Sequence, residues 1–289
     1  MRCRILRYCQ SRLRWALVVV ALIVFAKPLA AGDFSTQVMS ATFKIIDPKS
    51  TATAFVLSRP LKGERGKPEQ FESVLVTAAH VFELTEGNDV TLQLRSKKGE
   101  GDYQKLPMKL PIRARGKPLW FKHPSADVAA IRLSPPKEAE IPRLSLDLLA
   151  DDSTYKKFEL HPGDRIFGCG YPHQVEANAA GFPLLRSGVI ATFPLLPAKT
   201  VKSYFADLNT FEGDSGSPVF FDETNRSYGG KAQPGAVRLI LGIVIAQEFF
   251  DEEVKMHYGT IKARQRLGLA IVVPAEFIRE TVQLVPPKP

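Results

Sequence analysis

Residues 211–221 read FEGDSGSPVFF, in which a serine lies among small residues and an apolar run follows at once. Glycine adopts backbone conformations that other residues avoid, so a turn between two strands accounts for Gly213 and Gly216. It does not account for Ser215 and the aspartate before it. A catalytic serine needs a base, a group that orients the base, and donors for an oxyanion. The rest of the chain is therefore expected to supply a histidine and an acid.

Two other segments meet this expectation. His80 follows the apolar run SVLVTAA, where two alanines beside the imidazole leave room for it to reach a cleft. Asp127 opens DVAAIRL, whose other residues are almost all apolar. A carboxylate at the edge of a core strand is costly to desolvate unless a specific group pairs with it, and an imidazole N–H is such a partner.

The chain is long enough for one large or two small domains. It has 289 residues, of which 45% are hydrophobic and 24% charged, as in ordinary globular proteins. The formal charge of +9 is concentrated at the start, because residues 1–32 hold six basic residues and no acidic one. The remainder carries 33 basic against 30 acidic residues. A nearly neutral body gives no indication of nucleic-acid binding.

The N-terminal residues 1–32 have the three-part layout of a secretory signal peptide. Five arginines precede the apolar run WALVVVALIVFA (15–26), and small residues follow at Ala30, Ala31 and Gly32. We expect cleavage near Ala31 or Gly32 and a secreted or periplasmic protein with no stable membrane insertion afterwards. The alternative is a retained membrane anchor, although a span needs about 20 apolar residues.

Cysteine use agrees with a fold that does not depend on disulfides. Cys3 and Cys9 lie in the expected signal peptide, so Cys169 is alone in the mature chain. It lies in an apolar segment with no obvious basic neighbour, which favours a buried, inert thiol over a nucleophile.

Short runs rich in Val, Ile, Leu, Thr and Phe predict an all-β fold of two groups of six strands, each expected to form a small barrel, with a C-terminal helix. The first group of strands falls within residues 33–133 and forms the N-terminal barrel. Residues 134–160 lose the strand pattern and are expected to connect the halves. Residues 161–289 form the C-terminal barrel and the terminal helix, for which AEFIRETVQL (275–284) has amphipathic spacing.

TAAH at His80, DVAAI at Asp127 and GDSGSP at Ser215 resemble the three signature segments of bacterial trypsin-like (chymotrypsin-fold) serine proteases, in the same order. Taken singly, each has a plain structural explanation, since a histidine beside a strand or an acid at its start is common. The ordered set of three favours catalysis. The resemblance covers about residues 38–283 and implies two perpendicular six-stranded antiparallel β-barrels with the active site in the cleft between them.

The resemblance assigns a role to each residue. Ser215 would be the nucleophile, His80 the general base and then acid, and Asp127 the residue that orients His80. The backbone N–H groups of Gly213 and Ser215 would form the oxyanion hole. Nothing in the sequence marks a zymogen cleavage that would give Asp214 a new N-terminus as partner.

The resemblance also implies a primary substrate pocket. It would be lined by Asn209, Thr210, Ile245, Ala246, Gln247, Gly268 and Ala270. Asn209 stands where a preference for Lys or Arg would need an acid. The expected pocket is mixed and mostly uncharged, which suits medium apolar or small polar side chains.

These observations predict an exported serine endopeptidase that acts through an acyl-enzyme on protein or peptide substrates. The alternative is a catalytically inactive protein of the same fold that binds peptides or a partner through the cleft. No cofactor or metal is expected, because no pair formed by His123, His161, His173 or His257 with Cys, Asp or Glu has a recognised ligand spacing. The oligomeric state is left open.

Overall fold

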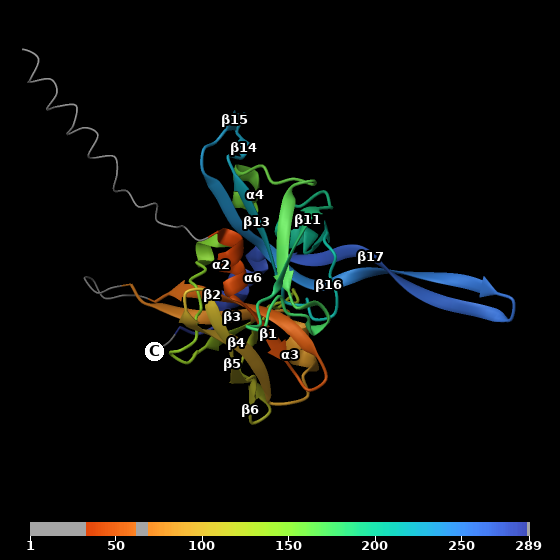
Figure 1. Cartoon of the computed structure of the whole chain (residues 1–289). Helices are drawn as coiled ribbons and strands as arrows, with labels where there is room; N and C mark the ends of the chain where they lie inside the picture. The colour runs from red at the N-terminus through yellow and green to blue at the C-terminus, as the bar shows by residue number, and fades with distance from the viewer. Residues whose placement is uncertain (1–32, 62–68, 288–289) are drawn as a thin grey trace, which may run out of the picture. The chain divides into compact units, whose positions relative to one another are not determined.

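The computed structural model describes residues 33–61 and 69–287, and the predicted signal peptide at 1–32 lies outside them. From Phe34 on, the chain forms one compact unit. The element bounds and the pairing of strands below refer to this unit (Figure 1).

The first half of the unit forms a seven-stranded antiparallel sheet in the order β5-β4-β1-β2-β3-β9-β8. Its strands are β1 (Thr42–Ile46), β2 (Thr51–Pro60), β3 (Phe71–Thr77), β4 (Asp89–Gly99), β5 (Asp102–Pro111), β8 (Phe121–Lys122) and β9 (Ala129–Leu133). A short pair, β6 (Arg113–Ala114) and β7 (Lys117–Pro118), lies between β5 and β8 along the chain. Among the described residues, β5 and β8 are the two edge strands of this sheet. The first half therefore differs from the prediction, which was a barrel of six strands.

The second half forms a closed six-stranded barrel in the order β10-β11-β12-β17-β16-β13. Its strands are β10 (Arg165–Gly170), β11 (Leu184–Ile190), β12 (Tyr204–Asp207), β13 (Pro218–Thr224), β16 (Ala236–Met256) and β17 (Gly259–Pro274). A short hairpin of β14 (Ser227–Tyr228) and β15 (Lys231–Ala232) stands apart from it. A closed barrel, a second large antiparallel sheet and a C-terminal helix confirm the predicted fold class.

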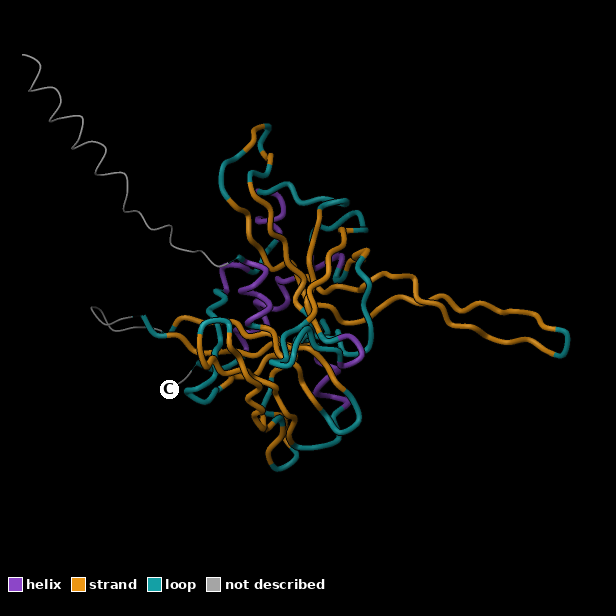
Figure 2. Tube along the Cα trace, in the orientation of Figure 1, coloured by secondary structure: helices purple, strands orange, loops and turns teal. Residues whose placement is uncertain are grey.

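The helices are short and connect or cover the sheets, as Figure 2 shows. They are α2 (Phe34–Ser40), α3 (Ala79–Leu84), α4 (Asp152–Lys157), α5 (Ala198–Val201) and α6 (Ala275–Leu284), with 3-10 turns at Leu146–Leu148 and Pro172–Gln174. Helix α6 covers the predicted residues 275–284. The stretch 134–160, predicted as a connector, holds one 3-10 turn and α4. No described helix is long and apolar enough to cross a membrane.

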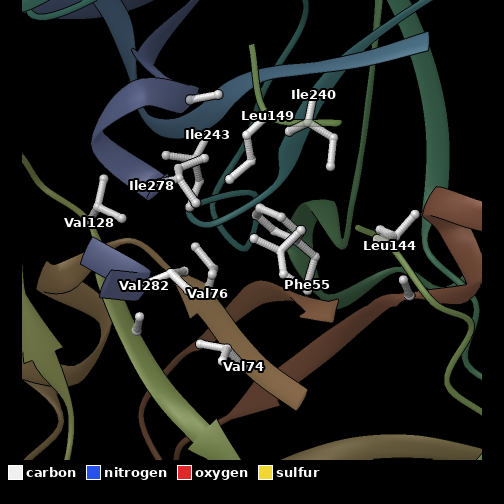
Figure 3. Packing of buried hydrophobic residues seen from close by; sticks show 14 of the residues in the cluster. Phe55, Val74, Val76, Val128, Leu144, Leu149, Ile240, Ile243, Ile278 and Val282 are labelled. Carbon is white, nitrogen blue, oxygen red and sulfur yellow. The ribbon is translucent and has the colours of Figure 1, made fainter. Parts of the chain in front are cut away.

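Strand β2 is buried on both faces, which explains why its sequence is apolar rather than alternating. Phe55 and Leu57 face a core cluster shared with the second half, whereas Ala54 and Val56 face a cluster within the first sheet. The shared cluster, shown in Figure 3, joins strands of both halves to α6. Its labelled members are Phe55, Val74, Val76, Val128, Leu144, Leu149, Ile240, Ile243, Ile278 and Val282. One continuous core therefore holds the two halves together.

Arg95 on β4 is the largest side chain that is almost completely buried, with 1% of its surface exposed. Its guanidinium donates to the carbonyl oxygens of Ser40, Thr42 and Gly181 at 2.7, 2.8 and 2.9 Å. Burial lowers its pKa, and among the described residues no carboxylate pairs with it. Arg95 thus ties the end of α2 and the start of β1 to the loop before β11.

We expect Arg95→Met to lower the free energy of unfolding by about 3–5 kcal/mol, because three carbonyl groups, those of buried Thr42 and Gly181 and half-buried Ser40, lose a charged donor. Urea denaturation measures the change. The control is Lys97→Met, two residues further along the same strand and exposed, which should be nearly neutral. Equal stability of the two variants would contradict the assigned role of Arg95.

Candidate active site

The turn between β12 and β13 carries Ser215, and its glycines are required by close backbone contacts. Gly213 and Gly216 have φ values of +97° and +95°. A Cβ on Gly213 would lie 2.2 Å from Tyr171 O, and one on Gly216 would lie 1.8 Å from Thr53 O. Only glycine fits at either position, which is the structural reason for the GDSG pattern.

His80 and Asp127 form a doubly bonded pair. Helix α3 begins just after β3, and Asp127 lies just before β9, the neighbour of β3 in the sheet. The His80 backbone N–H donates to Asp127 Oδ1 at 2.9 Å, and His80 Nδ1 lies 2.6 Å from Asp127 Oδ2. The pairing of two adjacent strands therefore brings these side chains together.

The hydrogen bonds in this pair determine which ring nitrogen of His80 carries the proton. Burial raises the pKa of Asp127, but the hydrogen bonds and positive charge that His80 provides outweigh it and hold the pKa below its usual value. An ionised carboxylate only accepts hydrogen bonds, so Nδ1 of a neutral His80 is the donor. His80 Nε2 is then left as an acceptor, as a general base requires.

Ser215 and His80 line the same cavity, which has a volume of about 430 Å³. The Ser215 hydroxyl points to the carbonyl oxygen of Ile245 at 3.5 Å. Between the described residues Ser215 and His80 there is no direct hydrogen bond. The structure places both groups on one cavity while the hydroxyl is turned toward Ile245.

The amides predicted to form an oxyanion hole are both available. Neither the Gly213 N–H nor the Ser215 N–H donates to an acceptor within the described residues. The His173 N–H donates to Glu212 O at 2.7 Å. Because the C=O and N–H of a trans peptide point in opposite directions, this bond directs the Gly213 N–H away from His173.

A second cavity of about 280 Å³ also contains Ser215. It is lined by the predicted pocket residues Thr210, Ala246 and Gln247, together with Phe211, Glu212, Val244 and Phe249. Thr210 Oγ1 and Gln247 Oε1 are buried without a hydrogen-bond partner among the described residues. Glu212 and Ser215 line both cavities, so the two cavities meet at the candidate nucleophile.

The other four predicted pocket residues, Asn209, Ile245, Gly268 and Ala270, are not among those that line this cavity. Asn209 is exposed, and its carbonyl oxygen accepts from Arg186 at 2.6 Å. Gly268 is close to it, since a Cβ on Gly268 would lie 3.4 Å from Asn209 Oδ1. Ile245 accepts the Ser215 hydroxyl, and Ala270 is fully buried in the interior of the barrel.

The sequence did not point to Arg186, the cation beside the nucleophile turn. Its guanidinium binds both oxygens of Asp214, at 2.8 Å to Oδ2 and 2.5 Å to Oδ1. Asp214 is completely buried, so its carboxylate needs such a partner. Arg186 thus supplies the positive charge beside Asp214 for which the sequence offered no new N-terminus. A buried Asp214 needs a cation nearby, and this need is the signal that could have identified Arg186.

Thr53 on β2 is a second residue that the sequence did not single out. Its N–H donates to Ser215 O at 2.9 Å, and its hydroxyl donates to Gly213 O at 2.6 Å. The Thr77 hydroxyl in turn donates to Thr53 O at 2.7 Å. The turn that carries Ser215 is thus bonded on both sides of the serine to a strand of the first half.

The remaining candidates for chemistry do not form a second site among the described residues. Cys169 is completely buried, and burial raises the pKa of its thiol to about 12, so it is an inert core residue as predicted. No described group of three or more His, Cys, Asp or Glu side chains is placed to hold a metal ion.

No protein-family model matches the chain. No curated protein matches it either. Among solved structures, the inactive form of a mutant of Rv3671c from M. tuberculosis H37Rv is 16% identical, with 90% of this chain and 93% of that chain covered and a TM-score of 0.46. The inactive form of the Rv3671c protease is 17% identical, with the same coverage and a TM-score of 0.44. A human pathogenic astrovirus serine protease is 14% identical, with 82% and 90% covered and a TM-score of 0.41.

The fold itself, a closed antiparallel barrel beside a second large sheet with a C-terminal helix, agrees with the trypsin-like double barrel that the sequence resembles. At such low identities, the roles of individual residues rest on the geometry of this chain alone.

We expect Arg186→Met to lower the free energy of unfolding by about 3–5 kcal/mol, because it leaves the buried carboxylate of Asp214 without a counter-charge. Denaturant unfolding measures the loss. Combining it with Asp214→Asn should recover part of the loss, since no charge then remains buried.

The matched control for this prediction is Arg264→Met, which removes the exposed ion pair with Asp251 and should change stability little. If Arg186→Met were as stable as this control, Arg186 would not be the counter-ion that the nucleophile turn requires.

Proposed function

We propose that this protein is an exported serine endopeptidase that hydrolyses peptide bonds through Ser215, His80 and Asp127. The observation that carries the proposal is that Asp127 holds His80 by two hydrogen bonds, at 2.6 and 2.9 Å, on the cavity that Ser215 lines. That arrangement leaves one acceptor nitrogen of an oriented imidazole on the same cavity as a hydroxyl, which is what nucleophilic catalysis by serine needs.

The proposed reaction begins with rotation of the Ser215 hydroxyl from Ile245 O to His80 Nε2. Such side-chain rotations are fast, and catalytic hydrogen bonds are often open before substrate binds. Ser215 Oγ then attacks the carbonyl carbon of the peptide bond while its proton passes to Nε2. His80 gives that proton to the departing amine, and the C–N bond breaks to leave an acyl-enzyme. Water then attacks the ester carbonyl carbon while His80 Nε2 takes one of its protons. The bond between that carbon and Ser215 Oγ breaks, the carboxylic acid product leaves, and Oγ regains a proton from His80.

The available N–H groups of Gly213 and Ser215 support this proposal, because the attacked carbonyl oxygen becomes negatively charged. Donors fixed at the place where charge develops lower the barrier, and one such donor is typically worth about 2.7–4 kcal/mol. Apart from Glu212, the residues that line the second cavity are uncharged, and Thr210, Ala246 and Gln247 support substrates with a medium apolar or small polar side chain at the cleaved bond.

We expect Ser215→Ala to reduce turnover of a cleavable peptide by about a million-fold, because the proposed acyl-enzyme forms on the Ser215 hydroxyl. Thermal unfolding should be nearly unchanged. A fluorophosphonate probe should label the unmodified protein at Ser215, as mass spectrometry of the labelled peptide would show, and leave the variant unlabelled.

Two outcomes would contradict the proposal. A Ser215→Ala variant that keeps a tenth of the activity would exclude Ser215 as the nucleophile. A folded, unmodified protein that neither reacts with the probe nor cleaves peptides would instead favour an inactive protein that binds peptides or a partner through the cleft.

Export is the second part of the proposal, and it rests on the signal-like pattern of residues 1–32. We expect N-terminal sequencing of the protein from the secreted or periplasmic fraction to begin near Ala31 or Gly32. A start before Trp15 would show that the segment is retained and that the protein is tethered to a membrane. Recovery of the full chain from the cytoplasm alone would contradict export.

A further inference from the structure

Strands β16 and β17 continue far beyond the barrel as a two-stranded hairpin, which Figures 1 and 2 show projecting away from it. We call residues 249–266 the arm. Within the described residues, the arm strands pair only with each other, from Phe249↔Arg266 to Met256↔Gly259. An isolated two-stranded hairpin is only marginally stable in water, so an arm of this length calls for an explanation.

One edge of β16 becomes free at the candidate active site. On that side, β16 pairs with β13 up to Ile243, and Val244 then exchanges hydrogen bonds of 2.8 and 2.9 Å with Gly216 and Ser217. From Ile245 outward, no described strand pairs with this edge. The carbonyl oxygen of Ile245, the first residue beyond this pairing, accepts the Ser215 hydroxyl at 3.5 Å. The unpaired edge of β16 therefore begins at Ile245, beside Ser215, and extends to Met256.

The arm has one apolar face and one charged face, because directly paired residues lie on the same side of a sheet. The apolar face consists of Phe250, Val254, Met256, Ile261 and Ala263, with Glu252 and Gln265. Its four large apolar side chains are between 42% and 58% exposed. The charged face holds the ion pairs Asp251 with Arg264 and Glu253 with Lys262, whose charges balance.

We propose that the free edge of β16, from Gln247 to Met256, receives the part of an extended polypeptide substrate that precedes the cleaved bond and adds it to the arm as a third strand. The proposal rests on the proposed protease function. An exposed strand edge is a template for such addition, since its backbone groups lack partners. Antiparallel pairing, the more stable arrangement, directs the N-terminal side of the substrate outward along the arm.

The substrate is a better occupant of this edge than a second copy of the chain. Phe249, the first arm residue, lines the cavity of Ser215, so a polypeptide in that cavity already touches the arm. A strand that continues from Phe249 follows β16 to Met256 over eight residues, about 27 Å at the usual rise. The arm holds three acidic and four basic residues, so its charge selects substrates only weakly, whereas its apolar face favours apolar side chains at alternate substrate positions.

The test uses a truncated variant in which Asn-Gly replaces residues 250–265. Phe249 and Arg266 are direct register partners, and Asn-Gly suits a two-residue hairpin turn, so the barrel and cavity are kept. Three peptides share one cleavable sequence: one has three residues before the cleaved bond, one has twelve, and one carries the nine extra residues after the bond instead.

We expect the unmodified protein to cleave the N-terminally extended peptide with about tenfold higher kcat/KM than the short one. The truncated variant should lose this gain and cleave the short peptide as the unmodified protein does, because the short peptide ends before the arm. The peptide extended after the bond should show no gain in either protein.

Two double variants test the role of the apolar face. Val254→Ser with Ile261→Ser should reduce the gain from N-terminal extension. The matched control on the opposite face, Glu253→Ser with Lys262→Ser, should keep it. If both pairs behaved alike, the apolar face would not contribute to substrate binding.

Binding distinguishes failure of this proposal from failure of the protease proposal. Fluorescence anisotropy with Ser215→Ala measures peptide affinity without cleavage, and N-terminal extension should strengthen binding only when the arm is present. If the unmodified protein cleaves nothing but shows this arm-dependent binding, the protease function fails and the arm proposal stands. Three results would overturn the arm proposal. The first is an equal loss of kcat/KM for all peptides after truncation, and the second is an equal gain in kcat/KM from extension on either side of the bond. The third is a dimer in light scattering that becomes a monomer on truncation.

Discussion

The hydrogen bonds of Thr53 to the nucleophile turn are the constraint on which the candidate site depends. His80 and Asp127 belong to the first half of the molecule and Ser215 to the second, so the three meet only if the halves are held in register. Thr53 donates from its amide to Ser215 O and from its hydroxyl to Gly213 O, on either side of the serine. A shift between the halves would break both bonds at once, and the shared apolar core makes such a shift costly.

The same contacts explain why the turn tolerates so little variation. A strand of one half approaches the backbone of the other so closely that Gly216 has no room for a Cβ, and Asp214 is buried completely beneath the turn. Burial of a carboxylate at this place requires a cation, which Arg186 supplies from β11. Close backbone packing and an internal ion pair thus fix the position of Ser215 before any substrate binds.

Much of this could be predicted from the sequence, and the rest could not for physical reasons. The terminal helix and the core strands were predictable because burial imposes a periodic apolar pattern, and 275–284 is helical as expected. The arm was not, because its residues 249–266 are exposed on both faces of the hairpin and charged residues interrupt the strand pattern. The roles of Arg186 and Thr53 could not be predicted, because strand register and contacts between the two halves determine their partners. Local sequence patterns carry no information on either.

Helix α6 closes the core between the two halves of the molecule. It packs against β3 and β9, which flank His80 and Asp127, as well as against β16 beside Ser215, and its Glu280 is hydrogen-bonded to the buried His123 at 2.9 Å. One amphipathic element thus contacts strands that lie beside every part of the candidate site. A chain shortened before Ala275 would expose the apolar surface that the two halves share, and the parts of the site would no longer be held together.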